Sequence, residues 1–167
     1  MKPEANATKP TEKEQEAKNL ELKKEKAKKK HEEAVKKQRE YNQGLLKEAQ
    51  FKTDDDTYSF VFDGGLFSFK LPTFMEKTRI KAILSEVTAD RNGLSVSSTF
   101  EIVGTGDMDL ICNAKVLTHT KVLMVTSPEK FNIEKLDDGK ANDLGYLILI
   151  SENEFIERKK KASSKDQ

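Results

Sequence analysis

The clearest pattern in the chain is an alternation of apolar and polar residues on both sides of a pair of glycines. Residues 58–62 read Tyr-Ser-Phe-Val-Phe, residues 66–71 read Leu-Phe-Ser-Phe-Lys-Leu, and Asp63-Gly64-Gly65 lies between them. A period of two around a glycine-rich turn predicts a β-hairpin. Its expected inner face carries Tyr58, Phe60, Phe62, Phe67, Phe69 and Leu71. Pro72 should end the second strand, because it has no N–H to donate.

Helical spacing of apolar residues follows the hairpin. Thr73 and Glu76 have the spacing of a capping box, in which each side chain satisfies a backbone donor of the other residue. The helix that they open carries one apolar stripe: Ile80, Ile83, Leu84 and Val87. A second capping box, from Ser98 to Glu101, predicts another helix, which must be short because Gly104 and Gly106 follow.

Two more helices are expected in the last third of the chain. Asp107 should cap a helix with Leu110, Ile111, Ala114 and Leu117 on its inner face. Residues 122–125 fit either a third strand or a continuation of that helix, because a short apolar run cannot be assigned by its period. Residues 130–139 read as a loop held by Phe131, Ile133 and Leu136. The final helix should cover about residues 141–160, with Leu144, Leu147, Ile148 and Phe155 facing inward.

The first third of the chain has no comparable apolar pattern. Residues 12–52 are rich in helix-forming residues, and opposite charges recur four apart, which predicts a long solvated helix. Gly44 should break or bend it near its end. One heptad position, Leu20, Ala27, Ala34 and Tyr41, is apolar, whereas the matching position, Lys24, His31, Gln38 and Leu45, is mostly polar. Self-association or partner docking through this helix therefore stays the weaker alternative.

The distribution of charge also separates the first third of the chain from the remainder. Residues 1–50 have a net charge of +4, residues 51–156 of −6 and residues 157–167 of +3, and seven of the nine phenylalanines lie between Phe60 and Phe131. We therefore expect a disordered tail (1–11), a charged helical extension (12–52), a globular α+β domain (53–158) and a basic disordered tail (159–167). In this domain a small antiparallel sheet of two or three strands packs with three to four helices. Truncation before Thr53 should leave it folded, because residues 1–50 offer little apolar area to bury.

Candidate chemistry is sparse. Cys112 is the only cysteine, which excludes an intramolecular disulfide, and it is interpreted as a small buried hydrophobe rather than as a nucleophile paired with His119. Two histidines and one cysteine cannot build a structural zinc site, and residues 54–56 lack the ligand spacing of an EF-hand. The glycines precede no Gly-Lys-Ser/Thr sequence that would hold a phosphate. We expect no catalytic residue, no cofactor and no metal, and hence no enzyme.

The same sequence limits the partners. The longest apolar run, residues 146–150, is far shorter than the ~20 residues that span a bilayer, and the N-terminus does not resemble a secretory signal. A cytoplasmic protein without membrane contact is expected. Residues 28–30 and 159–161 are lysine runs, but glutamates are interleaved with the first run and the domain between is acidic. These features argue against nucleic acid as a dedicated partner.

The last helix is apolar over a wider arc than its inner stripe needs. Tyr146, Leu149 and Ile150 lie beside the stripe formed by Leu144, Leu147 and Ile148. A helix of this kind is either enclosed by its own domain or shared with a partner. Tyr146, Leu149 and Ile150 are therefore the candidate partner-binding residues, and burial in the domain's own core is the alternative.

One stretch resembles a known family. Residues 117–138 contain an apolar run, the turn Pro128-Glu129 with Phe131 two residues on, and a Leu136-Asp137-Asp138 turn before a closing helix with Phe155. With the preceding hairpin, this order resembles the tail assembly chaperones of long-tailed (siphovirus-type) bacteriophages of Gram-positive hosts, over roughly residues 57–158. The long charged extension departs from that family's compact pattern.

The resemblance implies a non-enzymatic chaperone in the host cytoplasm. Such a protein would bind and solubilise the tape-measure protein until tail-tube subunits replace it. Two alternatives stay open: a phage structural protein, such as a head or head–tail joining component, and a small nucleic-acid-associated protein that uses its basic tails.

Overall fold

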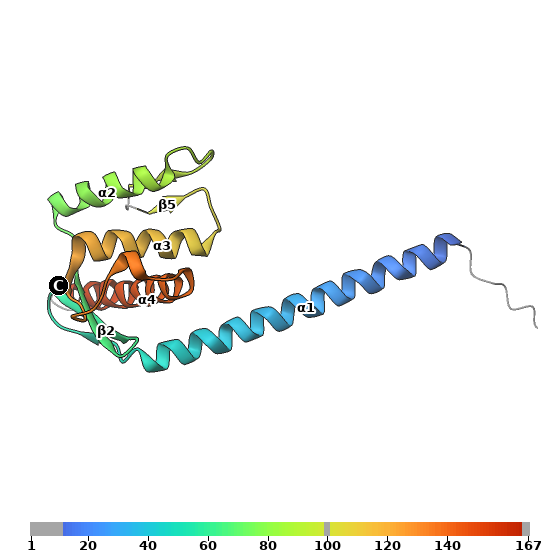
Figure 1. Ribbon diagram of the computed structural model, residues 1–167, viewed down its shortest axis with the longest axis horizontal. Coiled ribbons are helices and arrows are strands. Elements are labelled where there is room, and N and C mark those ends of the chain that lie inside the picture. Colours follow the sequence, from blue (N-terminus) through green and yellow to red (C-terminus); the bar gives the residue numbers. More distant parts are fainter. Residues whose placement is uncertain (1–11, 99–100, 165–167) are drawn as a thin grey trace, which may run out of the picture. The chain divides into compact units, whose positions relative to one another are not determined.

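The computed structural model describes residues 12–98 and 101–164, with side chains described from residue 21 on (Figure 1). The chain divides into two compact units, Met1–Gly44 and Leu45–Gln167, and the boundary falls inside the first helix. The elements in order are α1 (Glu12–Glu48), β1 (Lys52–Thr53), β2 (Thr57–Phe62), β3 (Gly65–Lys70), α2 (Phe74–Thr88), β4 (Ser95–Val96), β5 (Ile102–Val103), α3 (Met108–Thr118), the π-helical turn η1 (His119–Leu123), β6 (Met124–Thr126), the 3-10 turn η2 (Ile133–Lys135) and α4 (Asp138–Ser163). The predicted α+β class, with a long N-terminal helix, is confirmed.

The main sheet is antiparallel and has the strand order β1-β2-β3-β6. Its centre is the predicted hairpin, in which Phe60 pairs with Phe67 and Phe62 with Gly65. Asp63 and Gly64 form the two-residue turn with φ angles of 49° and 73°, the left-handed conformations that suit the twist of a hairpin. β6 supplies the third strand from the ambiguous run at residues 122–125, whose first half instead belongs to η1. β1 is a fourth strand that the sequence pattern did not indicate.

The sheet and α4 enclose the first of two cores. Tyr58, Phe60, Phe67 and Phe69 are buried on the inner face of the hairpin, whereas Phe62 and Leu71 are half-buried at its margins. They pack against the inner face predicted for the last helix: Leu144, Leu147, Ile148 and Phe155. Aromatic rings form much of the contact, with centroids 5.5 Å apart for Tyr58 and Phe155 and 5.0 Å for Phe67 and Phe131.

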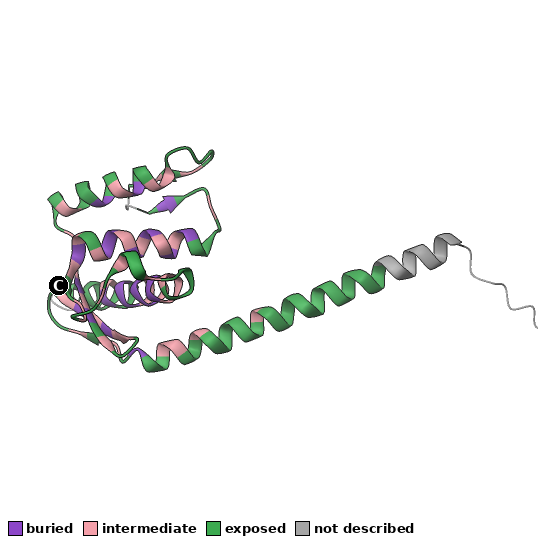
Figure 2. Ribbon diagram, in the orientation of Figure 1, coloured by how far each residue is buried: buried purple, intermediate pink, exposed green. Residues whose placement is uncertain are grey.

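A second core lies on the other side of α3. Figure 1 shows α3 between α2 and α4, and α3 is buried on both sides (Figure 2). Ile80 and Leu84 of α2 pack there with Ile102, Leu110, Ala114 and Leu123. On the α4 side, Gly145 lies so close to the backbone of Cys112 that a Cβ atom would overlap it, which lets the two helices approach closely. Both predicted caps, the Thr73–Glu76 box and Asp107, are present.

The prediction of a helix that begins at Ser98 is wrong. β4 and β5 form a short hairpin instead, and Thr99 and Phe100 lie outside the described residues. The Ser97 N–H donates to the Glu101 carbonyl at 2.8 Å, and the Glu101 N–H donates to Ser97 Oγ at 3.1 Å. The β-branched residues Val96, Ile102 and Val103 favour the extended pairing over a helix that Gly104 would end within one turn.

The boundaries of the domain also differ from those expected. α1 passes through Gly44 without a break, and Leu45, Leu46, Ala49 and Phe51 pack against the first core. The Val61 N–H donates to the Ala49 carbonyl at 2.6 Å. The folded unit therefore begins at Leu45 rather than at residue 53, because the last turn of the helix contributes apolar contacts that its charged sequence concealed.

At the other end, α4 continues to Ser163, so residues 159–163 are helical rather than disordered. The Arg158 guanidinium donates to Thr53 Oγ1 at 2.5 Å, and Lys159 Nζ lies 3.3 Å from an Asp56 carboxylate oxygen. Residues 54–56, which lack the ligand spacing of an EF-hand, form the exposed connection between β1 and β2. The expected disorder of residues 1–11 and 165–167 lies outside the described residues.

Candidate functional site

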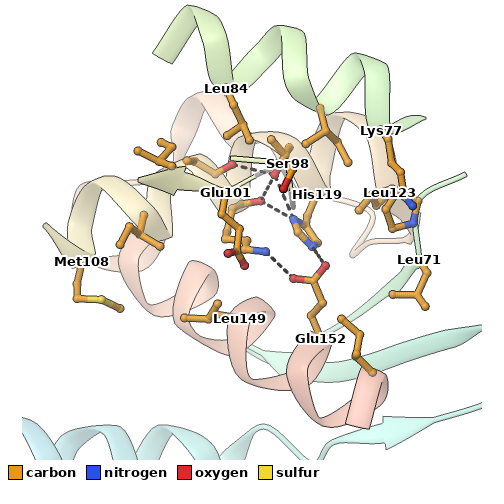
Figure 3. A pocket seen from close by; sticks show the side chains of 18 residues that line it. Leu71, Lys77, Leu84, Ser98, Glu101, Met108, His119, Leu123, Leu149 and Glu152 are labelled. Atoms are coloured by element: carbon orange, nitrogen blue, oxygen red, sulfur yellow. Dashed lines mark hydrogen bonds and ion pairs between the residues drawn. The ribbon is translucent and has the colours of Figure 1, made fainter. Parts of the chain in front are cut away.

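A cavity of about 620 Å³ lies within the Leu45–Gln167 unit, between α2 and the β4–β5 pair on one side and α3 and α4 on the other (Figure 3). Segments far apart in the sequence supply its mostly apolar wall: Leu71, Pro72, Ile80, Leu84, Ile102, Met108, Ile111, Ala114, Leu123, Leu149 and Ile156. Met108 is 48% exposed, so the apolar wall continues to the surface at the start of α3. The volume falls in the range of ~300–1,000 Å³ that is usual for binding pockets.

One of the three candidate partner-binding residues lines this cavity. Leu149 lies on the side of α4 that also presents Glu152 and Ile156, at spacings of three and four residues. Tyr146 and Ile150 are half-buried on the same helix but are not part of the cavity wall. The structure thus separates residues that the sequence grouped, and the partner-binding role of all three stays a prediction.

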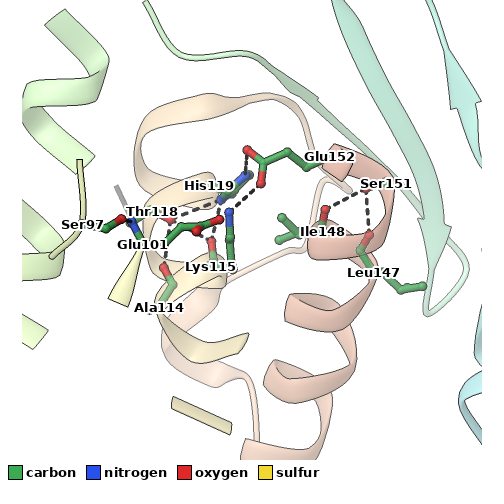
Figure 4. A network of polar contacts seen from close by, with 10 residues as sticks. All are labelled: Ser97, Glu101, Ala114, Lys115, Thr118, His119, Leu147, Ile148, Ser151 and Glu152. Carbon is green, nitrogen blue, oxygen red and sulfur yellow. Dashed lines mark hydrogen bonds and ion pairs between the residues drawn. The ribbon is translucent and has the colours of Figure 1, made fainter. Parts of the chain in front are cut away.

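Three charged or titratable side chains form a polar cluster in the apolar wall (Figure 4). Lys115 Nζ on α3 lies 2.6 Å from Glu152 Oε2 on α4. His119 Nε2, at the start of η1, lies 3.4 Å from Glu152 Oε1. All three side chains are largely withdrawn from solvent, with exposed fractions of 16%, 12% and 3% for Lys115, Glu152 and His119. We call these residues the buried charge cluster.

The orientation of His119 decides what this cluster can do. His119 Nδ1 lies 2.9 Å from the backbone carbonyl of Lys115, which can only accept, so Nδ1 carries a proton and donates. The contact of Nε2 with Glu152 Oε1, at 3.4 Å, is too long for a strong hydrogen bond. Both ring nitrogens therefore face oxygens of the protein itself. Neither is directed at a molecule in the cavity as a general base would be.

Glu152 stays ionised in this position. Burial alone raises the pKa of its carboxyl, but the contact with His119 and the charge and hydrogen bond of Lys115 outweigh burial and lower the pKa to about 2. The carboxylate therefore holds Lys115 of α3 and His119 of η1 against α4. This geometry favours a role in fastening the elements around the cavity over a role in proton transfer.

The other chemical candidates do not converge on the cavity. Cys112 is buried on the side of α3 that faces Gly145, and it does not share the cavity wall with His119. Burial, together with the charges of Asp109 and Asp143, raises the pKa of its thiol, which makes Cys112 a poor nucleophile. In the part of the chain that the structure describes, no group of His, Cys, Asp or Glu side chains is placed to hold a metal ion. No helix of that part is long and apolar enough to cross a bilayer.

The sequence carried only a weak signal for the buried charge cluster. Glu152 follows Ile148 and Leu149 and precedes Phe155 and Ile156, so a carboxylate interrupts an otherwise apolar helix face. That interruption indicates a buried partner, but Lys115 and His119 lie more than thirty residues away in the sequence. Their proximity depends on how α3 packs against α4, which no local pattern reveals.

Comparison of the chain with models of known protein families, with curated proteins and with solved structures finds no match.

Proposed function

We propose that this protein is a non-enzymatic tail assembly chaperone of a long-tailed bacteriophage. It acts in the host cytoplasm, where it binds the tape-measure protein and keeps it soluble until tail-tube subunits take its place. Two features support the proposal: the resemblance of residues 57–158 to that family and the apolar cavity between α2, α3 and α4. The cavity is the observation on which the binding mode rests.

The chemistry of the cavity suits an apolar client. An amphipathic helix binds a groove by placing apolar side chains from successive turns into it. The wall here offers Leu84 from one side, Leu149 from the other and Ile111 between them. Apolar residues of a client helix that enter this space leave water, at about 25 cal/mol per Å² of apolar surface buried.

The polar groups of the cavity favour binding over catalysis. Lys115 and His119 already contact Glu152, so the buried charge cluster leaves no cation or base directed at a substrate. A chaperone must also release its client, and a partly polar wall limits how tightly an apolar helix is held. Both considerations favour a reversible carrier of an apolar segment.

Co-expression with the tape-measure protein of the same phage tests this proposal. The parent chain should keep the client soluble, in several copies per client, and the complex should survive moderate salt because apolar contacts are little screened. Leu149→Arg, which places a charge in the cavity wall, should abolish solubilisation. Ile150→Arg is the matched control, because Ile150 is half-buried on the same helix but does not line the cavity. Thermal melts of both variants should show that they remain folded.

The possible failures differ from one another. If Leu149→Arg solubilises the client as well as the parent does, the client binds elsewhere on the chain. A complex that dissociates at moderate salt would point to the charged ends instead. If the parent chain and the client do not interact at all, the chaperone proposal fails and a structural role in the virion becomes the leading alternative.

A further inference from the structure

Along residues 21–41, one side of helix α1 carries lysines and no glutamate. Residues 21–41 contain nine Lys or Arg and five Glu residues, interleaved in the sequence. Three ion pairs four residues apart connect the glutamates to lysines on one side of the helix: Glu25–Lys29 at 3.0 Å, Lys28–Glu32 at 4.0 Å and Lys36–Glu40 at 3.9 Å. Pairs of this spacing stabilise a solvated helix by about 0.2–0.5 kcal/mol each. Three of the five glutamates thus serve the stability of the helix.

The other side of the helix is basic. Lys23, Lys26, Lys30 and Lys37 fall within about 60° of one another around the axis, at ~100° per residue. All four are exposed, and none makes an ion pair with any residue that the structure describes. Glu33 marks the edge of this side, about 20° beyond Lys26. We call these four lysines the lysine face.

Small residues lie beside the lysine face. Ala34 and Ala27 are exposed about 20° and 40° beyond Lys23, on the side of the lysine face opposite to Glu33. Short side chains there let a flat or grooved surface approach the helix backbone next to the lysines. Large apolar residues, which would point to a protein partner, are represented on this side of residues 21–41 by Tyr41, which is 53% exposed and lies at the same angle as Lys23.

The dimensions indicate what kind of anion fits. From Lys23 to Lys37 the helix advances about 21 Å, at ~1.5 Å per residue. A DNA duplex carries one negative charge per ~1.7 Å of its axis, so the lysine face spans a length that holds about twelve phosphates. Lysine ammonium groups bind phosphates as point charges and need no fixed geometry. A helix with a row of exposed lysines along one side therefore suits an evenly charged duplex.

We propose that the lysine face of α1 binds the phosphate backbone of duplex DNA without sequence preference. The interleaved glutamates argued against such a partner in the sequence, but the helix places Glu21, Glu25 and Glu32 on the opposite side and leaves Glu33 and Glu40 beside the lysine face, not on it. The acidic character of the chain belongs to the other unit. Residues 1–44 have 13 basic and nine acidic residues, whereas residues 45–167 have 17 basic and 20 acidic residues.

A matched pair of variants of the full chain tests this proposal. The first changes the lysine face: Lys23→Gln, Lys26→Gln, Lys30→Gln and Lys37→Gln. The second removes four positive charges from the remainder of the same helix: Lys24→Gln, Lys28→Gln, Lys29→Gln and Lys36→Gln. Both variants lose the same net charge, so any difference between them reports which side of α1 meets the DNA. The measurement is fluorescence anisotropy of a labelled duplex of mixed sequence across a salt series.

The parent should bind the duplex at low salt, with a slope of log affinity against log salt of about −3.6 for four phosphate contacts. The lysine-face variant should lose roughly tenfold or more in affinity and most of that slope, while the second variant stays within about twofold of the parent. Changing the four lysines of the lysine face to arginine should restore binding, because it keeps the charge. Far-UV circular dichroism should show that α1 remains helical.

Four results would overturn the proposal. One is a parent chain that does not bind the duplex. Another is an equal loss in the two glutamine variants, which would mean that net charge alone matters. A third is failure of the arginine variant to restore binding while its helix is intact. The last is binding to poly-glutamate as tight as to the duplex, which would make the lysine face a docking surface for acidic proteins instead.

Discussion

Glu152 lies where α4 would otherwise present an unbroken apolar stripe to the cavity. An unpaired carboxylate withdrawn from water costs several kcal/mol, and the protein offsets this cost with Lys115 Nζ at 2.6 Å and His119 Nε2 at 3.4 Å. Both partners come from α3 and the turn that follows it. One side chain thus joins the α3–η1 segment to α4 beside the proposed client site. Removal of Glu152 would leave the Lys115 ammonium group and the His119 ring without their partner in an apolar wall.

We expect Glu152→Ala to destabilise the domain by about 3–5 kcal/mol, because it leaves a buried lysine without its partner. The pKa of Glu152 in the folded protein is about 2, below its usual value. The contribution of this carboxylate to the unfolding free energy is therefore fully present above about pH 4.5, its value in the unfolded chain, and is lost as the pH falls toward 2.

Urea titrations at a series of pH values would measure this effect. Glu154→Ala is the control, because Glu154 is exposed on the same helix, and it should change stability by less than about 0.5 kcal/mol. The difference in stability between the parent and Glu152→Ala should shrink between pH 4.5 and pH 2. A difference that stays constant over this range would mean that packing, and not the charge of Glu152, stabilises the site.

Elements whose residues show a strong local pattern were predicted from the sequence, and elements without such a pattern were missed. Alternation and a glycine turn were enough to predict β2 and β3, and capping residues marked where α2 and α3 begin. β1, β4 and β5 are two residues long, too short to show a period. Residues 119–123 form a π-helical turn between α3 and β6. No pattern in the sequence predicts this turn.

The candidate site shows the same limit. The wide apolar arc of α4 predicted that the helix meets more than one surface, and it lies between the first core and the cavity. The sequence could not decide which residue meets which surface, because Leu149 and Ile150 are both apolar and adjacent. That assignment depends on the direction from which α3 approaches, which Gly145 permits through its missing side chain.

The hairpin offers a test at the level of one element. Phe69→Ala should destabilise the domain by about 3–5 kcal/mol, because Phe69 is fully buried against Tyr58 and Phe60. Leu66→Ala, on the opposite face of the same strand, should cost less than about 0.5 kcal/mol, since Leu66 is 49% exposed. Chemical denaturation followed by circular dichroism would compare the two. Equal effects would contradict the assignment of the inner face.

The two compact units differ in burial and in the features that they carry. Residues 21–44 bury no side chain and carry the lysine face, whereas the unit from Leu45 on contains both cores, the cavity and the buried charge cluster. If both proposals hold, the chain has a DNA-binding helix and a client-binding domain that fold on different interactions. The last turn of α1 and strand β1 belong to the second of these. Truncation can therefore test whether the folded domain begins at Leu45.

A chain that begins at Leu45 should unfold at nearly the same denaturant concentration as the full protein. A chain that begins at Thr53 loses the packing of Leu45, Leu46 and Phe51, the buried Ala49 and the pairing of β1 with β2. At about 1.5–3 kcal/mol for a fully buried large side chain, the partial burial of these residues predicts a loss of about 3–5 kcal/mol. Equal stability of the two truncated chains would restore the boundary at residue 53. A loss already present in the chain that begins at Leu45 would show that residues 1–44 stabilise the folded domain, and the two proposed functions could then not be separated by removing the helix.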